Sequence, residues 1–365
     1  MKKCIVIPDS YKGTISSADA AQIMKEEIHR VYPACEVIKV PISDGGEGLV
    51  DCLMKPLDGE IIKTKVRGPF GDYIQSFYGR SGETAVIEMA AAAGLHLAEG
   101  RLNPAKASTY GVGELIHNAV DNGCTDIIIG LGGSCTNDGG AGMAMALGTR
   151  FLNRDGQEFL PTGDTLKEVV QIDNRPTRDF LQGVSIRAMC DIDNPMFGQH
   201  GAAFVFAPQK GADEKMVEIL DENLRAFALT IKDQLGIDVS NLRGAGAAGA
   251  MGAGVVAFLG GTLGSGIGAI LDIVGFDSLL QGCDWVFTGE GKLDSQSLDG
   301  KAIGGIGNRA KKYSVPVIAV VGIKEGNVDE IYNKGVCKVY ETSKKIEYAG
   351  DYKMQLRQTM RDIVR

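Results

Sequence analysis

The sequence has few of the residue patterns that mark disulfide-rich, zinc-binding or nucleic-acid-binding proteins. Its eight cysteines are scattered over 365 residues without a C-x-x-C pair, so reduced thiols are expected instead of a disulfide framework. None of the four histidines pairs with a cysteine at a metal-ligand spacing, which argues against a zinc site. The net charge is −8 and no Lys/Arg-dense run occurs, so no nucleic-acid partner is expected.

No segment has the composition of a secretion signal or a membrane span. The apolar run after the two N-terminal lysines is too short for a signal sequence. The most apolar later stretch, 245–274, is broken by many glycines and carries Asp272, which favours a Gly/Ala-rich core helix over a membrane span. These absences predict a cytoplasmic protein without a membrane partner.

Glycine, by contrast, is abundant. The 50 glycines among 365 residues are about twice the usual share of roughly 7%, and they cluster in a few stretches. Hydrophobic residues make up 44% and charged residues 23%, as in soluble globular proteins, and the length allows two domains. The clusters predict tight turns and close backbone approaches of the kind found at ligand-binding loops.

Alternating strands and helices predict an α/β fold. Short apolar strands are expected at 4–8 and 36–42, and again at 285–288, 315–321 and 336–340, with helices between them. Five such strands indicate a doubly wound parallel sheet, for which we expect the flavodoxin-like strand order.

A long insert separates the second of these strands from the third. We assign residues 1–65 plus 283–365 to the flavodoxin-like α/β domain and residues 66–282 to an inserted, mixed α/β domain. The insert is predicted to contain short strands, helices at 106–122 and 213–235, and a Gly/Ala-rich helical stretch. We expect the active site in the cleft between the two domains.

The strongest local signal is a glycine-rich loop between a buried strand and a helix that begins near Ala141. It reads Gly-Leu-Gly-Gly-Ser-Cys-Thr-Asn-Asp-Gly-Gly from Gly130 to Gly140. Backbone amides and hydroxyls at such a position bind phosphate groups, although no lysine stands in the Walker register. The alternative is a turn that only lets the strand and the helix pack closely. The residues that we assign as nucleotide contacts are Gly132, Gly133, Ser134, Thr136, Asn137 and Asp138.

Acidic residues occur where ligands bind open α/β sheets, beyond the carboxyl ends of the expected parallel strands. Asp44 and Glu47 follow the second strand and Glu290 follows the third. Carboxylates in these places suit Mg²⁺, which prefers a few carboxylates together with phosphate oxygens. For Asp44 and Glu47, an acidic cap on the following helix is the alternative.

Three further residues are candidates for the chemistry of phosphoryl transfer. Asp191 follows the apolar run 184–189 and precedes Asn-Pro, so it either accepts the proton of a substrate hydroxyl or only shapes a turn. Lys12 after the first strand and Lys301 after the third are cations suited to a phosphate or a carboxylate. Most lysines, however, are solvated surface residues.

Taken together, these segments resemble the type I (bacterial) glycerate kinase family. The matching pieces occur in family order over nearly the whole chain, at 8–14, 43–48, 130–140, 190–195, 208–212, 246–252 and 288–301. Two departures are Tyr11, where phenylalanine is frequent, and Cys135, where a small residue such as alanine is expected. Neither departure removes a chemical group that the mechanism needs.

The resemblance implies ATP-dependent phosphorylation of D-glycerate, with 2-phosphoglycerate as the favoured product, and two α/β domains of which one is flavodoxin-like. On this basis Asp191, Lys12 and Lys301 are expected to be catalytic. Asp44, Glu47 and Glu290 are expected to hold Mg²⁺, and Gln209 and Lys210 to join the nucleotide contacts. The expected substrate contacts are Ser10, Asp44, Gly45, Gly46, Asn194 and Ser297.

Three alternatives remain open from the sequence. The enzyme could phosphorylate a related small hydroxy acid or form 3-phosphoglycerate, or the chain could be a nucleotide- or acid-sensing regulator without activity. A dinucleotide-dependent oxidoreductase is least favoured. It would need G-x-G-x-x-G after the first strand, where this chain reads Pro-Asp-Ser-Tyr-Lys-Gly from Pro8 to Gly13.

Overall fold

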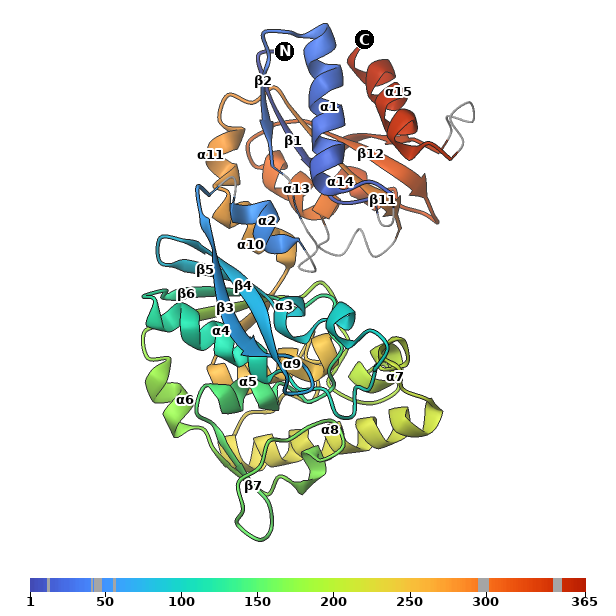
Figure 1. Ribbon diagram of the computed structural model, residues 1–365. Coiled ribbons are helices and arrows are strands. Elements are labelled where there is room, and N and C mark those ends of the chain that lie inside the picture. Colours follow the sequence, from blue (N-terminus) through green and yellow to red (C-terminus); the bar gives the residue numbers. More distant parts are fainter. Residues whose placement is uncertain (12–13, 41, 43–47, 55–56, 295–301, 344–349) are drawn as a thin grey trace. The chain divides into compact units, whose positions relative to one another are not determined.

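The chain forms two compact units in the computed structural model (Figure 1), which describes residues 1–11, 14–40, 42, 48–54, 57–294, 302–343 and 350–365. Unit 1 comprises Met1–Asp44, Lys55–Leu57 and Ser265–Arg365, and unit 2 comprises Gly45–Met54 and Asp58–Gly264.

These units differ in their boundaries from the division expected from the sequence. Helix α2 (Leu49–Met54) packs on strands of unit 2, and strand β3 (Glu60–Arg67) pairs with the next strand of that unit. Helices α10 (Gly266–Ile273) and α11 (Phe276–Leu280) instead contact α13 (Ala302–Lys311) of unit 1. Residues 265–282 are therefore grouped with unit 1 because their apolar faces are buried there.

Unit 1 contains a five-stranded parallel sheet in the order β13-β12-β11-β1-β2. The strands of this sheet are β1 (Lys3–Pro8), β2 (Glu36–Lys39), β11 (Trp285–Leu293), β12 (Val317–Lys324) and β13 (Val336–Glu341). Besides α10, α11 and α13, unit 1 contains the helices α1 (Ser17–Val31), α14 (Glu330–Asn333) and α15 (Tyr352–Val364). Strand β1 lies between β2 and β11, so the first and third strands of the unit are neighbours. The doubly wound sheet and its flavodoxin-like order are confirmed.

Helices α1 and α15, from the two ends of the chain, pack together on one face of this sheet (Figure 1). The hydroxyl group of Ser16 caps α1 by accepting a hydrogen bond from the backbone of Asp19 at 3.1 Å. Apolar residues at helical spacing, including Ile23, Met24 and Ile28, then face the sheet. Helix α13 contacts β11 and β12, and its buried residues lie outside this cluster, which places it on the other face.

Strand β11 is longer than the sequence suggested. We expected it to end at Thr288, but it continues to Leu293, because Glu290 pairs with Val321 and Leu293 with Lys324 of β12. Glu290 therefore belongs to the strand itself, and the expectation that it lies in a loop after the strand is wrong.

Unit 2 is built on a six-stranded mixed sheet in the order β10-β9-β6-β5-β4-β3. Strands β3, β4 and β5 pair antiparallel, whereas β5, β6, β9 and β10 run parallel. The strands are β4 (Tyr73–Ser81), β5 (Thr84–Glu88), β6 (Asp126–Gly130), β9 (Ser185–Met189) and β10 (Thr262–Gly264), with a separate pair β7 (Arg150–Leu152) and β8 (Gln171–Asp173). The helices are α3 (Ala90–Ala93), η1 (Leu95–Ala98), α4 (Tyr110–Asp121), α5 (Ala141–Ala146), η2 (Leu166–Glu168), α6 (Arg175–Phe180), α7 (Ala202–Phe206), η3 (Pro208–Lys210), α8 (Glu214–Leu235) and α9 (Ala247–Leu259).

Three phenylalanines lie at the centre of the apolar core of unit 2. Phe151, Phe227 and Phe258 are fully buried, and their ring centroids lie 5.5 to 6.0 Å apart. They join β7 to α8 and α9, and aromatic contacts of this kind add to the free energy gained by burial. The long helix α8 is capped by Asp213, whose carboxylate accepts from the backbone of Met216 at 2.8 Å.

Helix α9 departs from the regular helix that its Gly/Ala-rich sequence predicts. Ala248, Gly249 and Ala250 all have left-handed backbone angles, with φ between 56° and 66°. Alanine avoids this region because its Cβ atom meets the following carbonyl oxygen. Such strained residues persist where the surrounding structure holds them, often near functional sites.

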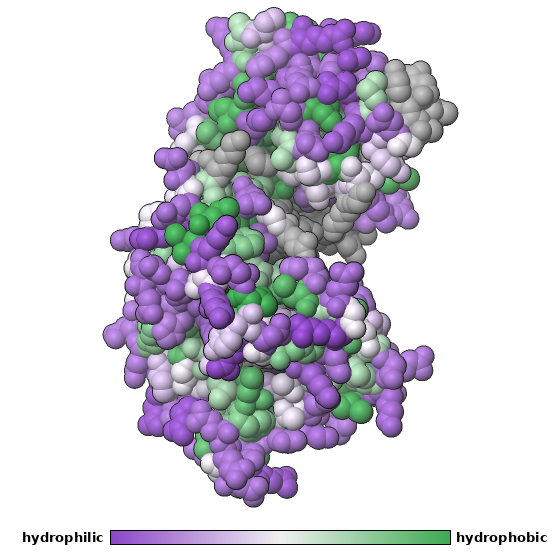
Figure 2. Space-filling view, in the orientation of Figure 1, coloured by the Kyte–Doolittle hydropathy of each residue, from purple (hydrophilic) through white to green (hydrophobic). Residues whose placement is uncertain are grey.

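Hydrophilic side chains cover most of the face shown in Figure 2, and hydrophobic ones gather there only in small groups. Within the described residues, no helix is both long and apolar enough to cross a membrane. None of the eight cysteines, all of which are described, forms a disulfide.

Candidate active site

The parallel strands of unit 2 bring two of the expected site loops to the same edge of its sheet. Glu88 at the end of β5 pairs with Gly130 of β6, and Gly130 pairs with Met189 of β9. The glycine-rich loop leaves β6, and Asp191 follows the end of β9. Both loops therefore begin on neighbouring strands at the carboxyl edge, where ligands of such sheets bind.

The glycine-rich loop turns most of its polar side chains into the protein. Ser134, Thr136, Asn137 and Asp138 are all buried, whereas Gly132 is partly exposed and Gly133 is exposed. The loop is also fixed by backbone hydrogen bonds, since Leu95 donates to the carbonyl of Gly133 and Cys135 donates to that of Ala93. Six residues of this loop were assigned as nucleotide contacts, and only the two glycines among them are accessible to solvent.

Asp138 holds the second half of the loop. Its carboxylate accepts hydrogen bonds from the backbone and hydroxyl of Thr109, at 2.7 and 2.9 Å, and from the backbones of Gly140 and Gly142. Burial raises the pKa of Asp138 above its ordinary value, although these hydrogen bonds favour the charged form. Two of these bonds hold Thr109, the residue that precedes α4.

Lys210 holds the first half of the loop. Its side chain is fully buried, and its Nζ donates to the hydroxyl of Ser134 at 2.8 Å and to the carbonyl of Thr136 at 2.7 Å. Burial lowers the pKa of Lys210 to about 8. The preceding residue, Gln209, is exposed.

Two residues of the loop have buried polar atoms without a partner among the described residues. The hydroxyl of Thr136 and the Oδ1 and Nδ2 atoms of Asn137 have no hydrogen bond in the part of the chain that the structure describes. Their backbone lies against the left-handed turn of α9, where a Cβ atom on Gly249 would approach the carbonyl oxygen of Thr136 to 2.0 Å. Only glycine allows this close approach.

The loop after β9 is held by the segment that leads into α9. Asn194 donates through its side-chain amide to the carbonyl of His200 at 2.8 Å, and its own carbonyl accepts from Gly246 at 2.9 Å. Asp193 forms a bidentate ion pair with Arg243, at 2.9 and 2.6 Å. Asp191 is half-buried in this loop.

In unit 1, Glu290 lies in β11, and Ser10 follows the adjacent strand β1. The backbone of Asp9 donates to the carbonyl of Gly289 at 2.8 Å, and that of Ser10 donates to the carboxylate of Asp9 at 2.6 Å. Glu290 is buried. Burial and the charge of Glu290 raise the pKa of Tyr11, whose hydroxyl donates to the carbonyl of Val320 at 2.6 Å.

Seven of the residues singled out from the sequence lie outside the described residues. They are Lys12, Asp44, Gly45, Gly46, Glu47, Ser297 and Lys301. The described part of the chain holds no cluster of three potential metal ligands. It contains only Glu290 of the three expected Mg²⁺ ligands, so the magnesium site stays a prediction.

Three residues that shape these loops were not assigned from the sequence. Glu88 accepts a hydrogen bond from the backbone of Val50 at 2.7 Å and thereby fixes the start of α2 at the carboxyl edge. Its signal was a charged residue at the end of an apolar strand. Thr109 carried no local signal, because its partner Asp138 lies far away in the sequence. Gly249 falls in the segment 246–252 that matched the family, but its close approach to Thr136 was not predicted.

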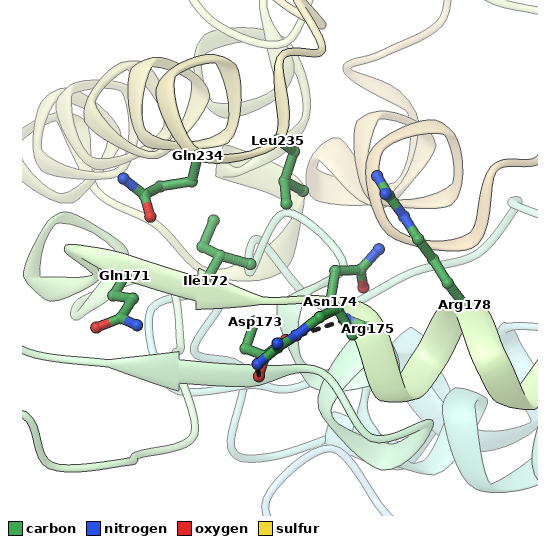
Figure 3. Close-up of a pocket in the computed structure, with 8 residues that line it drawn as sticks. All are labelled: Gln171, Ile172, Asp173, Asn174, Arg175, Arg178, Gln234 and Leu235. Atoms are coloured by element: carbon green, nitrogen blue, oxygen red, sulfur yellow. Dashed lines mark hydrogen bonds and ion pairs between the residues drawn. The ribbon is translucent and has the colours of Figure 1, made fainter.

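A separate pocket of about 310 Å³ opens on unit 2 between β8, α6 and the end of α8 (Figure 3). Arg175 folds back onto Asp173 in a bidentate ion pair, at 2.8 and 2.7 Å, which lowers the pKa of Asp173 to about 2. The amide of the buried Asn174 is engaged with Phe258 and Thr149. None of the residues assigned from the sequence lines this pocket.

Comparisons with known proteins find the same family over nearly the whole length of the chain. The model of the glycerate kinase family matches residues 4–365. The chain is 46% identical to the glycerate kinase of Bacillus cereus over 93% of its length and 90% of that protein. It is 42% identical, with the same two shares covered, to a protein of Escherichia coli named glycerate 2-kinase.

A solved structure gives the same result for the fold. A Salmonella typhimurium LT2 protein assigned as glycerate kinase 2 superposes with a TM-score of 0.85 at 38% identity, covering 100% of this chain and 97% of the other. Together with the family match, these similarities show that the chain belongs to the glycerate kinase family and is a kinase.

Proposed function

We propose that the protein transfers the terminal phosphoryl group of ATP to the 2-hydroxyl group of D-glycerate, as a type I (bacterial) member of its family. The relative named glycerate 2-kinase supports the position of transfer. The structural observation that carries the proposal is a set of buried polar atoms on Thr136 and Asn137, beyond the carboxyl end of a parallel strand, for which the described part of the chain supplies no partner. Buried polar atoms of this kind are normally satisfied by a ligand, an ion or water.

Phosphoryl transfer depends mainly on positioning and on neutralising charge. In this proposal the phosphates of ATP lie against the loop that begins at Gly132 and Gly133. Asp191 orients or deprotonates the attacking hydroxyl group, a role supported by its place just after β9, the strand that pairs with β6, from which the loop leaves. Asn194 joins the substrate contacts through the oxygen of its side chain, since its amide nitrogen donates to His200.

The remaining assigned residues, which come from both units, complete the proposed chemistry. Lys12 and Lys301 neutralise the substrate carboxylate and the transferring phosphoryl group. The proposed carboxylates for Mg²⁺ are Asp44, Glu47 and Glu290, and the ion, when bound, would neutralise phosphate oxygens. The further substrate contacts in this proposal are Ser10, Gly45, Gly46 and Ser297. Their assignment rests on the family motifs, as does the expectation that residues of both units act on the same substrates.

Two kinds of alternative compete with this proposal. The first is a kinase that forms 3-phosphoglycerate or uses a related hydroxy acid, because one carbon of reach separates the two products of glycerate. The second is a regulator that binds ATP without turnover. The cytoplasmic location expected from the sequence stays a prediction.

The deciding experiment measures ADP release with Mg-ATP and D-glycerate and identifies the product by phosphorus NMR. Glycerate-dependent turnover with 2-phosphoglycerate as product is the expected result. A 3-phosphoglycerate signal would overturn the position of transfer. ATP binding without turnover would favour another hydroxy acid first and the regulator second.

A pair of variants tests the role of Asp191. Asp191→Asn removes the proton acceptor with little change in shape, so kcat should fall by about 10²-fold or more. Asp193→Asn, two residues away in the same loop, breaks an exposed ion pair and should keep kcat within about twofold. Near-normal turnover of a folded Asp191→Asn enzyme would remove Asp191 from this role.

A further inference from the structure

Lys210 occupies a position that few lysines take. It ends the short helix η3, and its side chain is completely buried in unit 2. The next residue, Gly211, has a left-handed backbone with φ of 96°, and a Cβ atom there would lie 2.8 Å from the Cβ atom of Leu102. Leu102 thus packs directly against the backbone of the residue that follows Lys210.

The ammonium group is bound to the interior of the glycine-rich loop. Its two acceptors, the hydroxyl of Ser134 and the carbonyl of Thr136, lie on either side of Cys135. The titratable groups that face it are Asp138 and Cys135, whose thiol stays protonated because burial raises its pKa, and burial lowers the pKa of Lys210 to about 8. Burying an ammonium group is unfavourable unless hydrogen bonds compensate, so these contacts are what keeps it inside.

The loop is therefore tied at two points by two buried charges of opposite sign. Lys210 binds its first half from inside, and Asp138 binds its second half through Thr109, Gly140 and Gly142. An ammonium group engaged in this way cannot reach a phosphate on the solvent side of the loop without giving up both hydrogen bonds. The expectation that Lys210 touches the nucleotide thus conflicts with its contacts.

We propose that Lys210 is a positioning residue, which holds Ser134 and Thr136 in the conformation that the loop needs for phosphoryl transfer and does not itself touch ATP. The effect on catalysis rests on the function proposed above, whereas the effect on the loop does not. Without Lys210, a buried hydroxyl and a buried carbonyl lose their donor, and the first half of the loop should loosen while Asp138 still holds the second half.

The first test measures hydrogen exchange by mass spectrometry on the protein without ligands. Lys210→Met keeps the length of the side chain and removes its donors, so exchange of the amides of residues 133–137 should rise at least about tenfold. Peptides from unit 1 should be unchanged. The matched control is Lys215→Met, because Lys215 is an exposed lysine of the same unit, and it should exchange like the parent protein. Unchanged protection of residues 133–137 in Lys210→Met would overturn the proposal.

Ser134→Ala provides a second variant in case Lys210→Met does not fold. It removes one of the two acceptors, so exchange of the loop should rise by a smaller factor, about threefold to tenfold. If the two residues act through one hydrogen bond, Ser134→Ala should add little in the Lys210→Met background. Fully additive effects would contradict the contact.

The second test separates positioning from two other roles by measuring KM for ATP, kcat and the Kd for Mg-ATP. We expect Lys210→Met to raise KM and Kd by about threefold or more and to lower kcat about tenfold, together with the faster exchange without ligand. Weaker ATP binding with normal exchange would mean that Lys210 touches the nucleotide. Faster exchange with normal KM and Kd would mean a purely structural role. Either result overturns the proposal, and absent turnover in the parent enzyme would instead reject the proposed function.

Discussion

At the scale of single residues, several polar side chains of the glycine-rich loop form hydrogen bonds that stabilise the loop itself. A buried loop exposes its own backbone groups to an apolar interior, and each of these groups needs a partner. Asp138 and Lys210 supply such partners from one carboxylate and one ammonium group. The donors that made this loop resemble a phosphate site are therefore partly used to build it.

Gly249 offers the sharpest test at this scale. Gly249→Ala places a Cβ atom 2.0 Å from the carbonyl oxygen of Thr136, in a backbone with φ of 65°, so both the left-handed strain and a steric clash oppose it. The control Gly260→Ala has nearly the same φ of 64° and open space around the new atom. The control should cost about 1 kcal/mol, and Gly249→Ala at least about 2 kcal/mol more.

Urea unfolding followed by far-ultraviolet circular dichroism gives both values. Equal losses of stability for the two variants would mean that the close approach between α9 and the loop is not tight. A larger loss for Gly249→Ala, with ATP binding weakened as well, would link the left-handed turn to the conformation of the loop.

At the scale of elements, the first and last helices of the chain are joined by a buried carboxylate. Glu27 of α1 is only 2% exposed and accepts hydrogen bonds from Arg361 and Arg357 of α15, at 2.8 and 2.9 Å. Burial alone would raise the pKa of Glu27, but the two guanidinium groups outweigh it and hold the pKa below its ordinary value. A lowered carboxyl pKa stabilises the fold above the unfolded pKa of about 4.3, and this contribution is lost as the pH falls through the folded pKa.

Glu27→Gln should therefore lower the free energy of unfolding of unit 1 by about 2–3 kcal/mol at pH 7, because it breaks a partly buried ion-pair network. The difference from the parent protein should shrink as the pH falls below the unfolded pKa of about 4.3, because the carboxyl group is then protonated first in the unfolded chain and only at lower pH in the folded protein. The neighbouring Glu26 pairs with Arg357 at the surface, so Glu26→Gln should cost no more than about 0.5 kcal/mol. Fluorescence of Trp285, the one tryptophan of the chain, reports the unfolding of unit 1 in urea. A loss for Glu27→Gln that is the same at pH 7 and pH 3 would contradict this account.

The end of helix α13 carries a strained residue that can be relieved. Ser314 is exposed and has φ of 57°, while Ser314 and Val315 donate backbone hydrogen bonds to the last turn of the helix. Glycine adopts this conformation without strain, so Ser314→Gly should stabilise unit 1 by about 1 kcal/mol. Ser314→Ala keeps the strain and should give no gain. The midpoints of urea unfolding of the two variants measure this difference in stability. Equal midpoints would show that strain at this cap is negligible.

At the scale of the whole molecule, the sequence predicted the sheet of unit 1 better than the boundaries of the units. Five apolar runs with helices between them were enough to predict the strand order around β1. Strand β3 was missed because it lies at the edge of its sheet, and its alternating lysines and partly exposed residues give it no apolar run. The left-handed turn at Ala248 and Ala250 was missed because alanine normally favours a regular helix. The inward direction of Ser134 depends on Lys210, 76 residues later in the chain, which no local pattern encodes.

The topology also predicts which part of the chain folds alone. Among the described residues, both sheets of unit 2 and its apolar core are formed within residues 45–264. The sheet of unit 1 instead needs strands from both ends of the chain, and its β1 lies between β11 and β2. A fragment of residues 265–365 lacks β1, β2 and α1, so the apolar face that α1 covers would be exposed to water.

We expect the fragment 45–264 to unfold cooperatively in urea and to keep slowly exchanging amides. The fragment 265–365 should show neither property. If the fragment 45–264 proved unfolded while the full chain was stable, the core of unit 2 would depend on unit 1, because its own buried apolar surface would then fail to offset the entropy of ordering the chain.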